Sequence, residues 1–227
     1  MKKIICFLFV LIVIITTKSI VSFAAIEQPI PFLQYDEQWS SKPYSIINDS
    51  SQTIETSGCG PTTMAMVLNY YIDEDITPVE TAEFAIENHH RTTNNGTSWT
   101  YFNDVAEEYD LNFLQTYSSE EALKWMETKT DPLIICSMGP GLWTNKGHFI
   151  LIWDIKDGNA YINDPNSESE KRNKNSFNYL SKQCNQYFCF DRNTKIIFQN
   201  YLCCYFEKLN LFLLNENINK VSPMIIT

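Results

Sequence analysis

The fold is decided around residues 57–68, which read Ser57-Gly58-Cys59-Gly60-Pro61-Thr62-Thr63-Met64-Ala65-Met66-Val67-Leu68. A proline at this point suits the first turn of a helix, where the missing N–H is not needed. Apolar side chains then recur at Met64, Val67, Leu68 and Tyr71, which is the spacing of one helix face. The pattern predicts a helix that begins beside Cys59 and packs one face against a core.

Cys59 has the setting of a reactive thiol. The first backbone N–H groups of a helix are unpaired and carry a partial positive charge, and both lower the pKa of a thiol placed there. We expect Gly58 and Gly60 to let the chain turn tightly and to let a substrate carbonyl approach. The alternative is a small buried hydrophobic residue, which is the preferred interpretation of Cys136. For Cys59 the context favours a nucleophile.

Strand patterns follow Asp131-Pro132. Continuous apolar runs cover 133–138 and 148–153, and Asp157-Gly158 is a hairpin signal before a third run at 159–163. The preceding segments predict helices, at 77–88, 99–109 and 118–126, and a last helix and an edge strand are expected near Phe177 and Tyr187. Helices followed by strands indicate an α+β fold, with N-terminal helices packed on an antiparallel β-sheet.

Two further residues can complete the chemistry of a thiol nucleophile, which needs a base and a group that orients the base. His148 stands at the mouth of an apolar strand, where a titratable side chain needs a partner or a task. Asp164 ends the next run, so a hairpin at 157–158 would bring both side chains to the same end of the sheet. Asp164-Pro165 is also an ordinary start of a turn, which is the alternative interpretation.

Five motifs in this order resemble those of one family. They are Gln34-x-Asp36-x-x-Trp39, the run 57–68, Gly96-Thr97-Ser98-Trp99, Gly139-Pro140-Gly141 with Gly147-His148-Phe149-Ile150, and Asn163-Asp164-Pro165. Together they resemble the papain-fold cysteine peptidases related to the bacteriocin-processing (double-glycine leader) peptidases. The resemblance covers roughly Ile30 to Phe190. It implies a papain-like cysteine peptidase fold, in which the helix that carries the cysteine packs on an antiparallel sheet.

The resemblance also implies roles for single residues. Cys59 corresponds to the nucleophile, His148 to the general base and later acid, and Asp164 to the residue that fixes the imidazole tautomer. No metal ion or organic cofactor takes part in this chemistry.

The oxyanion hole would combine the Cys59 backbone N–H with a side-chain donor. Papain-like relatives usually place a Gln about six residues before the Cys, where this chain has Thr53. Gln34 or Gln52 must substitute, and Gln34 is preferred because it belongs to a shared motif.

Two loops are expected to flank the hairpin that would carry His148 and Asp164. Trp99 ends the loop 94–99 and Trp143 lies in the loop 139–146, and both rings are suited to packing a peptide. The alternative for both is core filling. With Gly58, Gly60 and Gly147 they form the predicted substrate-binding set.

Residues 1–24 predict a signal peptide. Lys2 and Lys3 form a basic start, the apolar run 4–15 is too short to span a bilayer, and Ser22-Phe23-Ala24 has the small-x-small cleavage pattern. We therefore expect a secreted or cell-surface protein with no membrane span after cleavage. A peptidase domain at 25–190 would be followed by an accessory C-terminal extension at 191–227.

Charge and cysteine content narrow the partners. The chain has 227 residues and a net charge of −10, which disfavours nucleic-acid binding. His89 and His90 are adjacent in a polar loop, a poor arrangement for one metal ion. Four of the seven cysteines lie near the C-terminus, and the sequence leaves their disulfide state open, as it does the oligomeric state; these are Cys184, Cys189, Cys203 and Cys204.

The sequence as a whole predicts an exported cysteine peptidase that acts on a peptide or protein substrate. One alternative is a cell-wall peptidoglycan amidase or endopeptidase, because other papain-fold hydrolases with the same Cys-His order cut peptidoglycan stems. The other is a non-catalytic secreted binding module on the same scaffold, against which the complete Cys-His-Asp set speaks.

Overall fold

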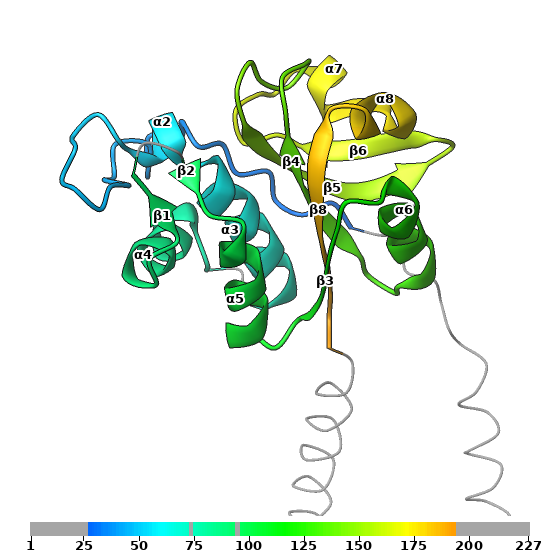
Figure 1. Cartoon of the computed structure of the whole chain (residues 1–227), viewed down its shortest axis with the longest axis horizontal. Coiled ribbons are helices and arrows are strands. Elements are labelled where there is room, and N and C mark those ends of the chain that lie inside the picture. The colour runs from blue at the N-terminus through cyan, green and yellow to red at the C-terminus, as the bar shows by residue number, and fades with distance from the viewer. Residues whose placement is uncertain (1–26, 73–74, 94–95, 194–227) are drawn as a thin grey trace, which may run out of the picture.

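The computed structural model describes residues 27–72, 75–93 and 96–193, in which helices cover both faces of one large sheet (Figure 1). The predicted signal peptide and nearly all of the predicted C-terminal extension lie outside the described residues, and so do Cys203 and Cys204. No described helix has both the length and the apolar character needed to cross a bilayer.

Most of the helices lie before the main strands in the sequence. The helices are α2 (Ile54–Ser57), α3 (Cys59–Tyr71), α4 (Pro78–Glu87), α5 (Thr100–Glu108), α6 (Ser119–Thr128), α7 (Glu170–Asn173) and α8 (Phe177–Ser181). Their starts follow local rules. The Thr77 hydroxyl caps α4 by accepting from the Val79 N–H, and the Ser118 hydroxyl caps α6 by accepting from the Glu121 N–H. The helices predicted from sequence at 77–88, 99–109 and 118–126 are therefore confirmed.

The main sheet has six strands among the described residues, in the order β3-β8-β4-β5-β6-β7, and each neighbouring pair is antiparallel. The strands are β3 (Asn112–Thr116), β4 (Leu133–Met138), β5 (His148–Lys156), β6 (Asn159–Asn163), β7 (Lys174–Ser176) and β8 (Cys184–Asp191). A two-stranded sheet, β1 (Arg91–Thr92) with β2 (Gly96–Thr97), lies beside α4 and α5. The predicted α+β class with an antiparallel sheet is confirmed.

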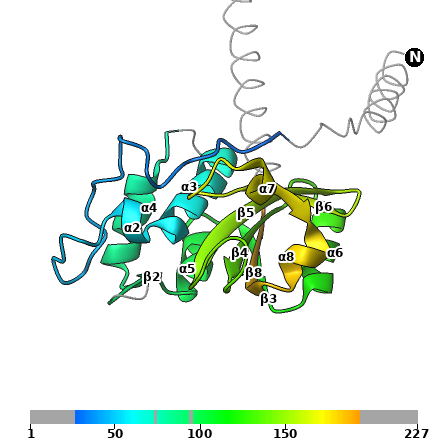
Figure 2. The same ribbon diagram turned by 90° about the horizontal axis from the view of Figure 1, so that it is seen from above.

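The two faces of the sheet carry separate apolar cores, because side chains alternate along each strand. Figures 1 and 2 show α3, α4 and α5 on one side, with α6 and α8 on the other. The helix-side core joins α3 and α5 to one set of strand side chains, among them Ile135, Leu151 and Phe188. The back core contains the alternating set, among them Ile134, Ile150 and Cys189. Burial on both faces explains why every residue of β4 except Ser137 is apolar.

The last strand is not where the sequence predicts it. β8 contains Tyr187 and lies between β3 and β4, so the prediction of an edge strand is wrong. β3 was not expected from sequence, and it takes the edge because its residues pair with β8, from Asn112 opposite Asp191 to Thr116 opposite Tyr187. The sheet thus extends one residue past the predicted domain boundary at 190.

Candidate active site

A cleft of about 580 Å³ opens beside the N-terminus of α3. It contains both Cys59, the first residue of α3, and His148, the first residue of β5. Other parts of its wall come from the segment before α2, from β2 and from the end of β4. The lining residues are Gln52, Thr56, Ser57, Cys59, Gly96, Thr97, Trp99, Ser137, Met138, Lys146, Gly147, His148, Phe149 and Asn185.

The glycines on either side of Cys59 allow the start of α3 to pack closely against Ile54 and Thr97. A Cβ on Gly58 would lie 2.5 Å from the Ile54 carbonyl oxygen, and a Cβ on Gly60 would lie 2.5 Å from Thr97 Oγ1. Gly60 is buried. The expected role of Gly60 in admitting a substrate carbonyl is therefore corrected: the space that its missing side chain leaves is filled by Thr97. Both glycines fix where α3, and with it Cys59, begins.

The hairpin predicted at 157–158 forms between β5 and β6, with Leu151 opposite Asn163. Asp164 follows β6 directly, and its Oδ1 lies 2.8 Å from Nε2 of His148. Both side chains are almost completely buried. The structure thus brings His148 and Asp164 together as a hydrogen-bonded pair, and the other ring nitrogen of His148 is left to face the thiol.

Burial opposes charge on both Cys59 and His148, but their partners outweigh it. Burial raises the pKa of the Cys59 thiol, yet the hydrogen bond with His148, the charge of His148 and the backbone N–H of Phe149 leave this pKa below its ordinary value. Burial lowers the pKa of His148, while Asp164 and Cys59 raise it from 6.5 to about 9. The two directions favour a thiolate paired with an imidazolium at neutral pH.

Asp164 has a cationic partner that the sequence analysis missed. Its Oδ1 also accepts the backbone N–H of Asn166 at 2.9 Å. Its Oδ2 lies 2.6 Å from Nη2 of Arg172, a residue of α7. In the sequence, Arg172 belongs to a charged loop typical of a solvated surface, and only the position of α7 beside the end of β6 reveals the contact.

The two candidate glutamines occupy different places. Gln34 is buried, its backbone N–H donates to the Pro165 carbonyl at 2.7 Å, and its side-chain amide donates to the Glu55 carbonyl. It connects the turn after Asp164 to α2 and does not belong to the cleft lining. Gln52 does line the cleft.

The amide group of Gln52 is held in one orientation. Its Oε1 accepts from Ser57 Oγ at 2.9 Å and from Nη2 of Arg91 at 2.6 Å. The Arg91 guanidinium is itself held by the Tyr44 carbonyl at 2.8 Å and the Gly96 carbonyl at 2.7 Å. Its NH₂ group donates one N–H to Ser51 Oγ at 3.5 Å. Because an amide NH₂ has two N–H donors, the second N–H is left to donate to a ligand.

The predicted substrate-binding residues separate into two groups. Trp99 lines the cleft and is 36% exposed, with one edge against Phe188. Gly147 also lines the cleft, and a Cβ there would meet open space. Trp143 is only 3% exposed and packs in the back core. The expectation that Trp143 contacts substrate is therefore corrected, because its ring fills the core and its Nε1 donates to the Arg172 carbonyl at 3.0 Å.

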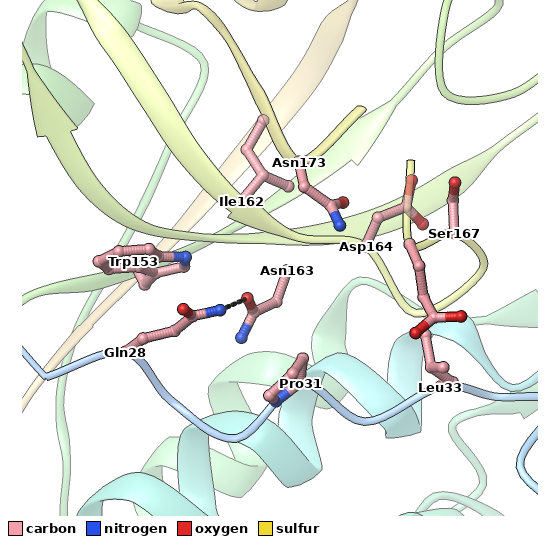
Figure 3. Close-up of a pocket in the computed structure, with 10 residues that line it drawn as sticks. Gln28, Pro31, Leu33, Trp153, Ile162, Asn163, Asp164, Ser167 and Asn173 are labelled. Carbon is pink, nitrogen blue, oxygen red and sulfur yellow. Dashed lines mark hydrogen bonds between the residues drawn. The ribbon is translucent and has the colours of Figure 1, made fainter. Parts of the chain in front are cut away.

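A second pocket, of about 300 Å³, lies beside Asp164 and does not include Cys59 (Figure 3). The N-terminal segment forms one wall, and Gln28 donates to Asn163 Oδ1 at 2.9 Å. Asn163 in turn donates to the Pro29 carbonyl at 2.8 Å. The segment at residues 28–33 therefore supports the end of β6 through Asn163.

No group of three or more His, Cys, Asp or Glu side chains within 27–72, 75–93 and 96–193 is arranged to hold a metal ion. The four cysteines in these ranges, Cys59, Cys136, Cys184 and Cys189, are free thiols. Cys136 is buried, as its sequence context predicts.

Comparison with known proteins finds one matching family model. Residues 34–190 match the Peptidase_C39 like family. No curated protein matches the chain.

Several solved structures are similar to this chain, and they include the following three. One is the peptidase domain of Streptococcus ComA, a bifunctional ABC transporter involved in a quorum-sensing pathway (15% identity, TM-score 0.46, covering 61% of this chain and 93% of that one). A second is a double glycine motif protease from an AMS/PCAT transporter in complex with the leader peptide (23% identity, TM-score 0.43, 60% and 84% covered). A third is a C39-like peptidase from Bacillus anthracis (14% identity, TM-score 0.44, 74% and 97% covered).

Proposed function

Because this chain belongs to the Peptidase_C39 like family, we propose that it is an exported cysteine peptidase that hydrolyses peptide bonds through an acyl-enzyme on Cys59. The observation that carries the proposal is the meeting of Cys59, at the start of α3, with a His148 that is hydrogen-bonded to Asp164 at 2.8 Å. A thiol, a base and an orienting carboxylate in this order are what thiol-dependent acyl transfer requires.

In the first half of the reaction, the Cys59 thiolate attacks the carbonyl carbon of the scissile peptide bond. The His148 imidazolium then gives its proton to the leaving amine as the C–N bond breaks, and the new N-terminus departs. Asp164 holds the ring through Nε2, so the nitrogen that faces Cys59 carries the proton in transit.

In the second half, neutral His148 takes a proton from water, and the resulting hydroxide attacks the thioester carbonyl. The bond between carbon and sulfur breaks, the thiolate returns and the carboxylic acid product leaves. Each half passes through an oxyanion, which a preorganised hydrogen-bond donor stabilises.

For that oxyanion we assign Gln52 as the side-chain donor, together with the Cys59 backbone N–H. Gln52 lines the cleft, and Arg91 and Ser57 fix its carbonyl oxygen. One N–H of its NH₂ group donates to Ser51 Oγ at 3.5 Å, and the second N–H is left for the oxyanion. Gln34, the choice made from sequence, has its amide engaged by Glu55. Gln52→Ala should lower kcat by about 10²–10³-fold with an intact fold, and Gln34→Ala should act mainly on stability.

Export rests on the N-terminal pattern at 1–24, and its test is separate from that of the chemistry. Tagged full-length protein should be found outside the cell with an N-terminus at or near residue 25, determined by N-terminal sequencing. Retention in the cytoplasm at full length would contradict export while leaving the proposed peptidase activity standing.

The substrate class is tested by incubating residues 25–227 with a library of peptides and, separately, with purified peptidoglycan. We expect new peptide termini in the library, detected by mass spectrometry, and none with the Cys59→Ala variant. Cleavage of peptidoglycan alone would support the amidase or endopeptidase alternative instead. If the protein binds the peptide library or peptidoglycan but cleaves neither, the result would contradict catalysis and support a binding module.

A further inference from the structure

Arg172 contacts both the candidate active site and the back core. Its Nη2 lies 2.6 Å from Asp164 Oδ2 and donates to the Trp143 carbonyl at 2.8 Å. Trp143 Nε1 returns a hydrogen bond to the Arg172 carbonyl at 3.0 Å. The Trp143 carbonyl thus holds the guanidinium beside the carboxylate, while the Trp143 ring holds the main chain of Arg172.

The carboxylate of Asp164 is fully buried, and a buried charge is costly unless it is paired. Its Oδ1 is used by His148 and by the Asn166 N–H, at 2.8 and 2.9 Å. Its Oδ2 forms an ion pair with the guanidinium of Arg172, whose side chain is 20% exposed. Since a carboxylate can rotate about its last torsion, contacts at both oxygens are needed to hold Oδ1 toward the ring.

We propose that Arg172 is a positioning residue for the candidate active site, which keeps the Asp164 carboxylate turned toward His148 and so sustains the thiolate–imidazolium pair. The inference rests on the proposed function and adds a residue that touches neither substrate nor thiol. It follows the general pattern in which partners of an orienting carboxylate are needed to keep the carboxylate in place.

Two effects of Arg172 on His148 have opposite signs, and this makes the inference testable. A positive charge beyond Asp164 disfavours the imidazolium through space, so losing that charge alone would raise the pKa of His148. Losing the orientation of the Asp164 carboxylate removes the hydrogen bond that raises the pKa of His148, so this pKa would fall. A positioning role predicts the fall.

Other charged groups face Asp164 and stay the same in the test. Cys59 of α3 lies beyond His148, and Glu168 of the loop after β6 lines the pocket beside Asp164. Tyr35 of the N-terminal segment contacts Glu168 at 3.4 Å, and the charges of Glu168 and Asp164 add to burial in raising the pKa of this tyrosine. None of these groups is changed by a substitution at Arg172.

The experiment measures the His148 pKa by NMR titration of ring-labelled histidine, in the Cys59→Ser background so that the thiol does not titrate. The chain has three histidines, so His89 and His90 are internal controls. We expect Arg172→Gln to lower the His148 pKa by about one unit, equivalent to tenfold in the protonation equilibrium. Arg172→Lys, which keeps a cation that reaches Asp164 less well, should lower it by less.

Two controls separate positioning from a structural role. Trp143→Phe removes the Nε1 bond to the Arg172 carbonyl, so it should lower thermal stability but leave the His148 pKa where it is. In an Asp164→Asn background, Arg172→Gln should cause no further fall of this pKa. If Arg172→Gln does not fold, the comparison of Arg172→Lys with Trp143→Phe decides the question in the same way.

An unchanged or raised His148 pKa in folded Arg172→Gln would overturn the inference. So would a fall of equal size in the Asp164→Asn background. A parent protein whose His148 titrates near 6.5, together with slow alkylation of Cys59 in the unmodified chain, would instead contradict the proposed function, because the catalytic pair itself would be absent.

Discussion

The two sides of the candidate active site are built differently. His148 and Asp164 come from one hairpin, β5–β6, and the turn that follows it, so their 2.8 Å contact is set by neighbouring segments of chain. Cys59 comes from the helical layer, and its distance from His148 depends on how α3 packs against β5 across the helix-side core. The proposed base is therefore placed by local chain geometry, and the proposed nucleophile is placed by tertiary packing.

The glycines next to the two reactive residues show the same difference. Gly58 precedes Cys59, and a Cβ there would lie 2.5 Å from the Ile54 carbonyl oxygen. Gly147 precedes His148, and a Cβ there would meet open space. The helix side has no room for adjustment around its reactive residue, whereas the sheet side does, so equivalent changes on the two sides should have unequal effects.

The largest effect is expected where the two sides must act together. Cys59→Ala and His148→Ala should each lower kcat by roughly 10⁴–10⁶-fold, and the double variant should be little worse than either single one, because residues of one catalytic unit are not additive. Asp164→Asn should cost the same or less, since an amide can still orient the ring. If the loss in kcat of the double variant equals the product of the two single losses, Cys59 and His148 do not share a site.

A smaller and unequal effect is expected at the two glycines. Gly58→Ala forces a backbone shift at the start of α3 and should destabilise the fold by about 1–3 kcal/mol while also lowering kcat, because Cys59 moves with the helix. Gly147→Ala should change stability by less than about 0.5 kcal/mol. Denaturant unfolding and kcat of the matched pair test this, and equal effects would contradict the difference between the two sides.

The smallest effect on chemistry is expected at the two tryptophans. Trp99→Ala should raise KM several-fold with little change in kcat, because its partly exposed ring lines the cleft. Trp143→Phe should lower stability by about 1–2 kcal/mol, through the lost hydrogen bond and volume, with KM unchanged. If instead Trp143→Phe raised KM and Trp99→Ala left it unchanged, Trp143 rather than Trp99 would contact the substrate.

The parts of the fold that local rules determine could be predicted from sequence. The helices expected to begin near Thr77 and Ser118 and the turn expected at 157–158 are present, because each depends on residues within a few positions. The place of β8 could not be predicted. Its partners, β3 and β4, are chosen by burial on both faces of the sheet, which the order of segments along the chain does not reveal.

The same division holds for the candidate site. The pairing of His148 with Asp164 follows from the hairpin, so the sequence is enough to anticipate it. Arg172 was missed because a charged run carries no sign of which member turns inward, and Trp143 was misplaced because an aromatic ring in a loop is equally suited to a surface or a core. The choice between Gln34 and Gln52 depended on side-chain contacts with Glu55 and Arg91.

The central claim is that Cys59 exists as a thiolate paired with His148, and alkylation tests it most directly. Iodoacetamide at pH 6 is followed by peptide mass mapping, with Cys136 as an internal control, because burial raises the pKa of that thiol well above its ordinary value. A thiol of ordinary pKa, about 8.5, is under about 1% ionised at this pH. We predict that Cys59 is modified at least tenfold faster than Cys136 and that His148→Ala removes the difference. Equally slow modification of both thiols, or fast modification of Cys59 that His148→Ala leaves unchanged, would contradict the account.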